Sequence, residues 1–293
     1  MLNLFLQFLI NGLLVGGVYA LLALGVVFIY RATQVFNFAV GDMVLFGAFV
    51  CWSFLVWAQW PVWAALLLAL LVSFGLGLLI ERLLMRPMIG QPLLSMIMAT
   101  LGLSLFLRGV MSFIWSTSTV SYPHKLLPGQ TLKFGGLFVS DELLWAFGVA
   151  ILVFVVLSLF FQRGRIGYGM RATAEDHQVA QATGINVKNI FALTWSIAGL
   201  VAAIGGVLLA SRVGLSVVST PLVALKIFPA VLFGGLESIL GAIVGGLLVG
   251  VLENLAGGLI DPKIAEITPY LILLLVLLIR PEGAFGLKRI ERI

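Results

Sequence analysis

The sequence predicts an all-α polytopic membrane protein with about eight transmembrane helices and one re-entrant half-helix. Of its 293 residues, 61% are hydrophobic and only 10% are charged, and the mean hydropathy is +1.17. Several apolar runs reach the roughly 20 residues that a helix needs to span a bilayer. These runs do not alternate in polarity, as the strands of outer-membrane barrels do. We therefore expect one transmembrane domain that covers residues 1–293.

Eight apolar segments are candidates for spanning helices. In chain order they are Leu4–Tyr30, Val35–Ala58, Pro61–Ile80, Pro92–Trp115, Leu143–Phe161, Ile190–Ser211, Ser238–Ile260 and Ile264–Ile279. A ninth segment, Leu222–Gly235, has only about 14 residues and contains Pro229. That length and that helix breaker predict a half-helix that enters the membrane and turns back.

The basic residues predict the orientation, because Lys and Arg accumulate on the cytoplasmic side of a membrane. With the N-terminus outside, the inner gaps hold Arg31, Arg82, Arg86, Arg163, Arg165, Arg171, Lys188, Arg280, Lys288, Arg289 and Arg292. The outer gaps hold Lys125, Lys133, Arg212 and Lys263. This excess predicts a cytoplasmic tail at residues 280–293 and a cytoplasmic segment at residues 163–188.

Composition and motifs exclude several other classes of protein. The net charge of +5 comes from basic residues in the gaps between spans, so we expect no nucleic-acid partner. Cys51 is the single cysteine, and His124 and His177 lie in different loops, so neither a disulfide nor a His-based metal site is expected. No phosphate-binding or hydrolase motif is present. The chain is therefore expected to bind no cofactor and to be no enzyme.

The cytoplasmic segment Arg163–Lys188 interrupts the apolar pattern. Its glycine-rich start is loop-like, Thr173 and Asp176 have the spacing of a capping box, and Gly184 is a helix stop signal. The pattern predicts a helix of about ten residues, which is too short to be stable alone in water. From these residues alone, a docking surface for a soluble partner and a simple connecting loop are equally favoured.

Two further patterns lie within this segment. Arg171 and Glu175 are four residues apart and can form an ion pair on a helix. Val179, Ala182 and Ile185 form a small apolar face.

Six polar residues fall in or at the ends of apolar runs, where charge is costly. They are Asn37, Asp42, Arg108, Lys226, Glu237 and Glu253. Two of the sites coincide with helix breakers, namely Asn37–Asp42 with Gly41 and Glu237 with Gly234–Gly235. Broken helices are where transporters commonly expose backbone groups to a substrate, so we favour a pathway role for both regions. For Arg108 and Glu253 we favour pairing within the bundle.

Four blocks in order resemble the permeases of branched-chain amino acid ABC transporters. They are NFAVGD at Asn37–Asp42, the Gly167–Asn186 part of the cytoplasmic segment, LKIFPAVLFGGLESILGAIVGG at Leu225–Gly246, and RPEGAFG at Arg280–Gly286. Their order and spacing fit nearly the whole chain. The length resembles the shorter of the two permeases that such systems usually pair.

The resemblance implies a multi-subunit importer in a bacterial inner membrane. Its partners would be a second homologous permease, two cytoplasmic ATPases that bind ATP and Mg²⁺, a periplasmic substrate-binding protein and membrane lipid. The resemblance assigns an ATPase-coupling role to Arg171, Thr173, Glu175, Asp176, Val179, Ala182 and Gly184. It assigns the translocation path to Asn37, Phe38, Gly41, Asp42, Phe228, Gly234, Gly235, Glu237 and Ser238.

Departures from the family pattern leave the substrate open. Val40, Asp42, Glu237 and Leu240 stand where relatives often have His, Glu, Gly and Pro. The expected substrates are branched-chain amino acids or a related small polar, acid or amide solute. The alternative is an ion- or proton-coupled secondary transporter that uses Asp42, Glu237 and Glu253 as ion sites.

Overall fold

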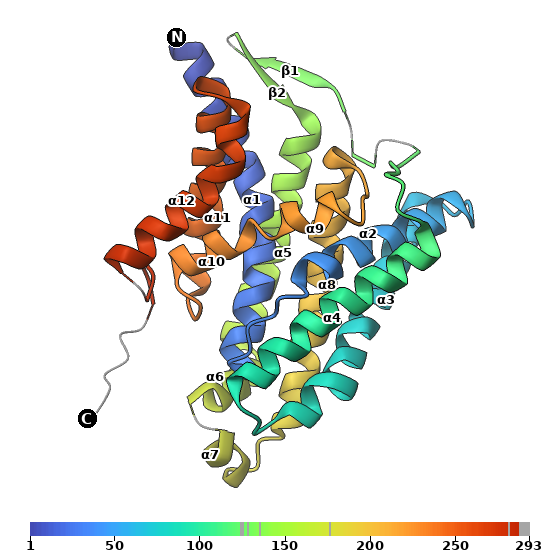
Figure 1. Ribbon diagram of the computed structural model, residues 1–293, viewed down its shortest axis with the longest axis vertical. Coiled ribbons are helices and arrows are strands. Elements are labelled where there is room, and N and C mark those ends of the chain that lie inside the picture. The colour runs from blue at the N-terminus through green and yellow to red at the C-terminus, as the bar shows by residue number, and fades with distance from the viewer. Residues whose placement is uncertain (124–125, 128, 135, 176, 281, 287–293) are drawn as a thin grey trace. The chain divides into compact units, whose positions relative to one another are not determined.

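The computed structural model describes residues 1–293 except 124–125, 128, 135, 176, 281 and 287–293, and the described part is mostly helical (Figure 1). The helices are α1 Leu2–Thr33, α2 Val40–Val56, α3 Val62–Ile80, α4 Leu93–Trp115, α5 Asp141–Arg163, α6 Arg165–Glu175, α7 His177–Ala182, α8 Val187–Val213, α9 Ser219–Ala224, α10 Ile227–Gly234, α11 Ile239–Leu259 and α12 Pro262–Ile279. A π-helical turn, Glu81–Met85, and a 3₁₀ turn, Arg86–Met88, continue α3.

Within the described residues, seven helices are long and apolar enough to cross a membrane: α1, α3 with its continuation, α4, α5, α8, α11 and α12. The apolar helix α2 has 17 residues and is shorter. The predicted all-α, multi-pass fold class is therefore confirmed. The predicted count of eight spanning helices is not confirmed. The eighth candidate, α2, is shorter than the seven helices that are long enough to cross a membrane.

The segment expected to be one half-helix, Leu222–Gly235, is instead part of two short helices, α9 and α10. Pro221 and Pro229 are each the third residue of their helix. A proline is tolerated in the first turn, where its missing N–H group has no partner within the helix. Each proline therefore fits the start of a helix, and the chain begins a new helix at Ile227.

The structure also contains a β-hairpin that the sequence analysis did not predict. Strands β1 Thr131–Phe134 and β2 Leu137–Ser140 pair antiparallel, with Thr131 opposite Ser140. The side-chain amide of Gln7 in α1 accepts a hydrogen bond from the backbone N–H of Phe138 at 2.7 Å and donates one to its carbonyl oxygen. Strands of four residues are too short for a polarity pattern to reveal them.

Contacts between Cα atoms divide the chain into two compact units. Unit 1 comprises residues 1–27, 127–154 and 226–293, and unit 2 comprises residues 28–126 and 155–225. In unit 1, α10, α11 and α12 pack together, and glycines of α11 face α1. A Cβ atom on Gly250 would lie 2.4 Å from the Cα of Gly16, and one on Gly246 would lie 2.4 Å from the Cα of Ala20. Small residues at these positions let the helix backbones approach closely, as is typical of helices packed in a membrane.

In unit 2, α8 packs against both α2 and α3. A Cβ on Gly77 of α3 would lie 2.1 Å from the carbonyl oxygen of Trp195, and a Cβ on Gly206 would lie equally close to that of Val44 in α2. The Trp195 side chain is fully buried. Glycine at these positions allows three backbones to touch, and the resulting core fixes the start of α2.

Candidate functional site

The first candidate site is the non-helical segment between α1 and α2. Residues 34–37 have no regular structure, and Gln34 has a φ of 55°. The side chain of Asn37 is buried, its Oδ1 accepts a hydrogen bond from Ala39 N at 3.0 Å, and its Nδ2 lies 3.4 Å from Met43 Sδ. Asn37 thus shapes the turn that leads into α2, as expected for an interruption at this position.

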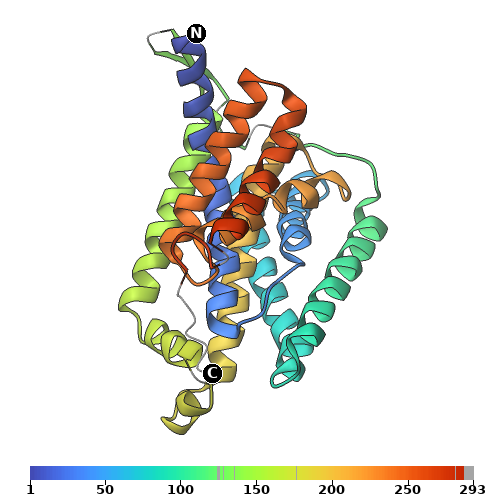
Figure 2. The ribbon, with the colours of Figure 1, turned by 60° about the vertical axis from the view of Figure 1, so that its left-hand side comes forward.

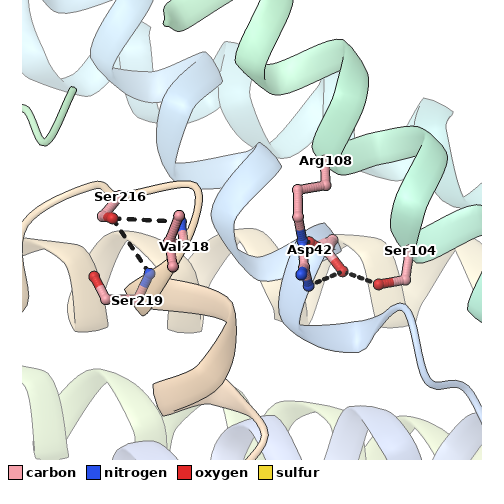
Figure 3. Close-up of polar contacts among 6 residues, drawn as sticks. All are labelled: Asp42, Ser104, Arg108, Ser216, Val218 and Ser219. Carbon is pink, nitrogen blue, oxygen red and sulfur yellow. Dashed lines mark hydrogen bonds and ion pairs between the residues drawn. The ribbon is translucent and has the colours of Figure 1, made fainter. Parts of the chain in front are cut away.

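Asp42 lies in the first turn of α2 and joins it to α4 (Figure 3). Arg108 Nε lies 3.1 Å from Asp42 Oδ1, and the hydroxyl of Ser104 donates to Asp42 Oδ2. The carboxylate side chain is only 2% exposed, whereas that of Arg108 is 36% exposed. The ion pair and the extra hydrogen bond offset the cost of burying the charge. The predicted pairing of Arg108 within the bundle is confirmed.

The opposite side of the α2 start contacts α9. A Cβ on Gly41 would lie 2.7 Å from the carbonyl oxygen of Pro221, so glycine is needed for this approach. Before α9, the Ser216 hydroxyl accepts hydrogen bonds from the backbone N–H groups of Val218 and Ser219 (Figure 3). Thr220 Oγ1 accepts another from Ser216 N at 2.9 Å. Irregular backbone at membrane depth is tolerated where protein groups satisfy it in this way.

The second candidate site, in unit 1, is the break between α10 and α11. Gly235 has a φ of 93°, a conformation that favours glycine, and a Cβ on Gly234 would lie 2.1 Å from the carbonyl oxygen of Gly241. The hydroxyl of Ser238 accepts a hydrogen bond from Gly241 N at 2.9 Å and caps α11. Phe228 and Glu237 are both partly exposed. The predicted break is confirmed.

An ion pair lies beside this second break. Lys226, which precedes α10, has its Nζ 2.6 Å from Glu253 Oε1 on α11. The two side chains are 13% and 12% exposed, and the other carboxylate oxygen of Glu253 has no hydrogen-bond partner in the described structure. Glu253 therefore pairs within the bundle, as expected.

The residues predicted to form the path thus fall into two groups. The structure brings Asn37, Gly41 and Asp42 to the start of α2, with Phe38 against Phe36 at a ring-centroid distance of 4.8 Å. Phe228, Gly234, Gly235, Glu237 and Ser238 belong to the other unit and are described on their own. Ser104 is a site residue that the sequence analysis missed, because a serine within an apolar run gives no signal.

The third candidate site is segment 163–188, which is predicted to be cytoplasmic. Its helical part begins at Arg165 rather than Thr173, and Thr173 lies within α6, where its hydroxyl donates to Gly169 O at 2.7 Å. The predicted helix start is therefore wrong, and Asp176, the other half of the capping box, lies outside the described residues. Gly167 allows a close turn rather than a loop, since its Cβ would lie 1.7 Å from Phe161 O.

The end of the segment matches the prediction. Gly184 has a φ of 86° and follows α7, and Ile185 N donates to Ala180 O at 3.0 Å. Ala180 is buried with Val187 and Phe191 at the start of α8, so the short helix is indeed supported by a longer one.

Two predictions about side chains in this segment concern the Arg171–Glu175 ion pair and the apolar face. Arg171 stacks on the Tyr168 ring at 4.5 Å and donates to Phe161 O at 3.1 Å, while the side chain of its predicted partner, Glu175, lies outside the described part of the structure. Val179 and Ala182 are exposed, whereas Ile185 packs against the cluster. An exposed apolar group therefore remains on α7.

Buried polar clusters at broken membrane helices, together with short helices between two long ones, are typical of membrane transport proteins. The family model for the branched-chain amino acid transport system / permease component matches residues 8–279. This chain belongs to that family.

Individual relatives agree with this assignment. The chain is 33% identical to the high-affinity branched-chain amino acid transport system permease protein BraD of Pseudomonas aeruginosa, over 99% of this chain and 98% of BraD. It is 30% identical to LivH of Escherichia coli, with the same coverage. The solved structure of PsaBC from Streptococcus pneumoniae in complex with Fab has a TM-score of 0.50 and 16% identity, over 97% of this chain and 98% of that one. That likeness concerns the fold alone.

Proposed function

We propose that this chain is the permease subunit of an ATP-driven importer of branched-chain amino acids or a related small polar, acid or amide solute. The observation that carries the proposal is the match to BraD and LivH over nearly the full length of all three chains. The subunit works by alternating access between the two sides of the membrane.

The two breaks shape the translocation path in this proposal. Non-helical backbone before α2 and between α10 and α11 supports it, because such backbone can offer hydrogen-bonding groups to a polar solute. The first group comprises Asn37, Phe38, Gly41 and Asp42. The second comprises Phe228, Gly234, Gly235, Glu237 and Ser238.

The segment α6–α7 couples the permease to an ATPase. Val179 and Ala182 are exposed on α7, while the neighbouring Ala180 is buried against α8. This packing supports a role of the exposed residues as a rigid contact surface. An ATPase shifts the conformational equilibrium only through contacts that differ between the two states. The coupling group is Arg171, Thr173, Glu175, Asp176, Val179, Ala182 and Gly184.

The assembly contains a second homologous permease, two cytoplasmic ATPases that bind ATP and Mg²⁺, and a periplasmic binding protein. It lies in a bacterial inner membrane with the N-terminus outside and the C-terminus in the cytoplasm. Family membership supports an assembly of this type, and the distribution of basic residues supports the orientation.

The test is purification of the chain from its host in mild detergent, followed by mass spectrometry and uptake assays in proteoliposomes. We expect two ATPase chains and a second permease to co-purify, and uptake to require ATP and the binding protein. A chain that purifies alone and transports on an ion gradient without ATP would overturn the proposal in favour of the secondary transporter.

A further inference from the structure

A groove lies between α3 and α4, within unit 2. These helices run in opposite directions and are joined at one end by the turn around Gly90 (Figures 1 and 2). The groove has a volume of about 510 Å³, and all ten residues that line it are apolar. On α3 and its continuation they include Leu76, Leu79 and Leu83, and on α4 they include Ala99, Gly102 and Phe106.

The groove is open towards the surroundings of the protein. Leu79 is 55% exposed, Leu83 is 72% exposed and Phe106 is 66% exposed. A Cβ on Gly102 would meet nothing within 4 Å, which leaves open space at the middle of the α4 side. In a spanning hairpin such a surface is covered by lipid or by another helix.

The length of the groove matches one leaflet of a bilayer. Leu76 and Leu84 are its outermost lining residues on α3 and its continuation, and they are eight residues apart. At 1.5 Å per residue this corresponds to about 12 Å. One half of the hydrocarbon core is about 15 Å deep. A single acyl chain is therefore long enough to extend along the whole groove.

Near the α3–α4 turn, Arg82 precedes the groove residue Leu83 in the chain and carries a positive charge, without itself lining the groove. The π-helical turn Glu81–Met85 lies there, and π turns frequently occur at functional sites. Glu81 is fully buried and accepts two hydrogen bonds from Arg86, at 3.0 and 3.1 Å. The Arg86 charge is thereby neutralised. Arg82 is exposed, and no described side chain pairs with it.

We propose that the α3–α4 groove binds one anionic phospholipid, with an acyl chain along the leucine-lined wall and the headgroup phosphate at Arg82. Charge complementarity selects this occupant, because a purely apolar helix would cover the groove and leave Arg82 without a counter-charge. Basic residues at the membrane surface attract anionic lipids in this manner. The site does not depend on which solute the protein transports.

The experiment is native mass spectrometry of the full-length chain, purified with its accompanying subunits and titrated with phosphatidylglycerol or phosphatidylethanolamine. We expect one phosphatidylglycerol to bind more tightly than the others, and more tightly than phosphatidylethanolamine. Arg82→Gln should weaken its association about fivefold, since one basic residue near the surface contributes about that much. Arg82→Lys should retain the affinity.

Gly102→Leu fills the groove and should reduce this binding at least tenfold. Gly109→Leu is the matched control, because Gly109 also lies on α4 in open space but does not line the groove. Unchanged phosphatidylglycerol binding in Gly102→Leu would overturn the proposal, as would equal losses for the two lipids in Arg82→Gln. Loss of a subunit from Gly102→Leu with the lipid retained would show a protein contact instead, and would overturn it as well.

Discussion

Asp42 and Arg108 show how one ion pair can determine the position of a broken helix. The Asp42 carboxylate is almost fully buried, and the interactions that stabilise its charge come from Arg108 and from the hydroxyl of Ser104. Removal of one partner from a buried pair is costly, because the other charge remains without compensation. The half-exposed position of Arg108 reduces that cost, since water can reach its guanidinium group.

We therefore predict that Asp42→Asn and Arg108→Gln each destabilise the protein by about 2 kcal/mol. The double variant should be less destabilised than the sum of the two, with a coupling of about 1 kcal/mol. Thermal unfolding of the purified chain in detergent measures all three. Strict additivity would show that the pair contributes nothing to stability.

Tyr122, in the segment after α4, gives a pH-dependent prediction. Its hydroxyl donates to Ala48 O at 2.9 Å, and burial, followed by the neighbouring Cys51 thiol, raises its pKa well above the usual value of 10.0. The neutral hydroxyl stabilises the fold fully below pH 10, and this stabilisation is lost as the pH rises from there towards the raised pKa.

Tyr122→Phe should lose about 1 kcal/mol at neutral pH, because the hydrogen bond is absent. Its melting temperature should fall less between pH 9.5 and 11 than that of the natural protein. Tyr168→Phe, which changes an exposed residue, is the control. Parallel declines in the Tyr122→Phe variant and the natural protein would contradict the assignment.

At the scale of elements, the sequence predicted the spans far better than the segments between them. Long apolar runs define α3, α4 and α12 to within three residues, because the bilayer requires a minimum length. Segment 163–188 was harder to predict. A glycine such as Gly167 is common in loops, so the sequence predicted a loop there. In the structure Gly167 instead allows a close approach to Phe161, a contact that only the folded chain reveals. The contact between Asp42 and Ser104 joins residues that are 62 positions apart in the chain, and a local sequence pattern cannot predict a contact over such a separation.

The exposed side of α7 provides a test of coupling. Val179 is 60% exposed, so Val179→Arg should leave folding and membrane insertion intact. If α7 contacts an ATPase, the added charge should lower transport-stimulated ATP hydrolysis about tenfold. Gln162→Arg adds the same charge at the exposed end of α5 and should have little effect. Equal hydrolysis in both variants would exclude α7 from the contact.

At the scale of the whole molecule, the chain offers a direct test of orientation. Cys51 is the single cysteine and is buried, so Cys51→Ser provides a background for labelling. With the N-terminus outside, Gln130→Cys should react with a membrane-impermeant maleimide in intact spheroplasts. Ala182→Cys should react only after the membrane is opened. The reverse pattern would invert the proposed topology and place α7 away from any cytoplasmic ATPase.

The contact between Gln7 and the β-hairpin has a consequence for solubility and assembly. A hairpin presents unpaired backbone groups along its edges, and such edges attract strands from other molecules. The Gln7 side-chain amide pairs with both outward-facing backbone groups of Phe138. It donates to the carbonyl oxygen and accepts from the N–H group. It thereby takes the place of one residue of a third strand. Any molecule that meets β2 at this point must recognise its side chains, because the backbone there is already paired.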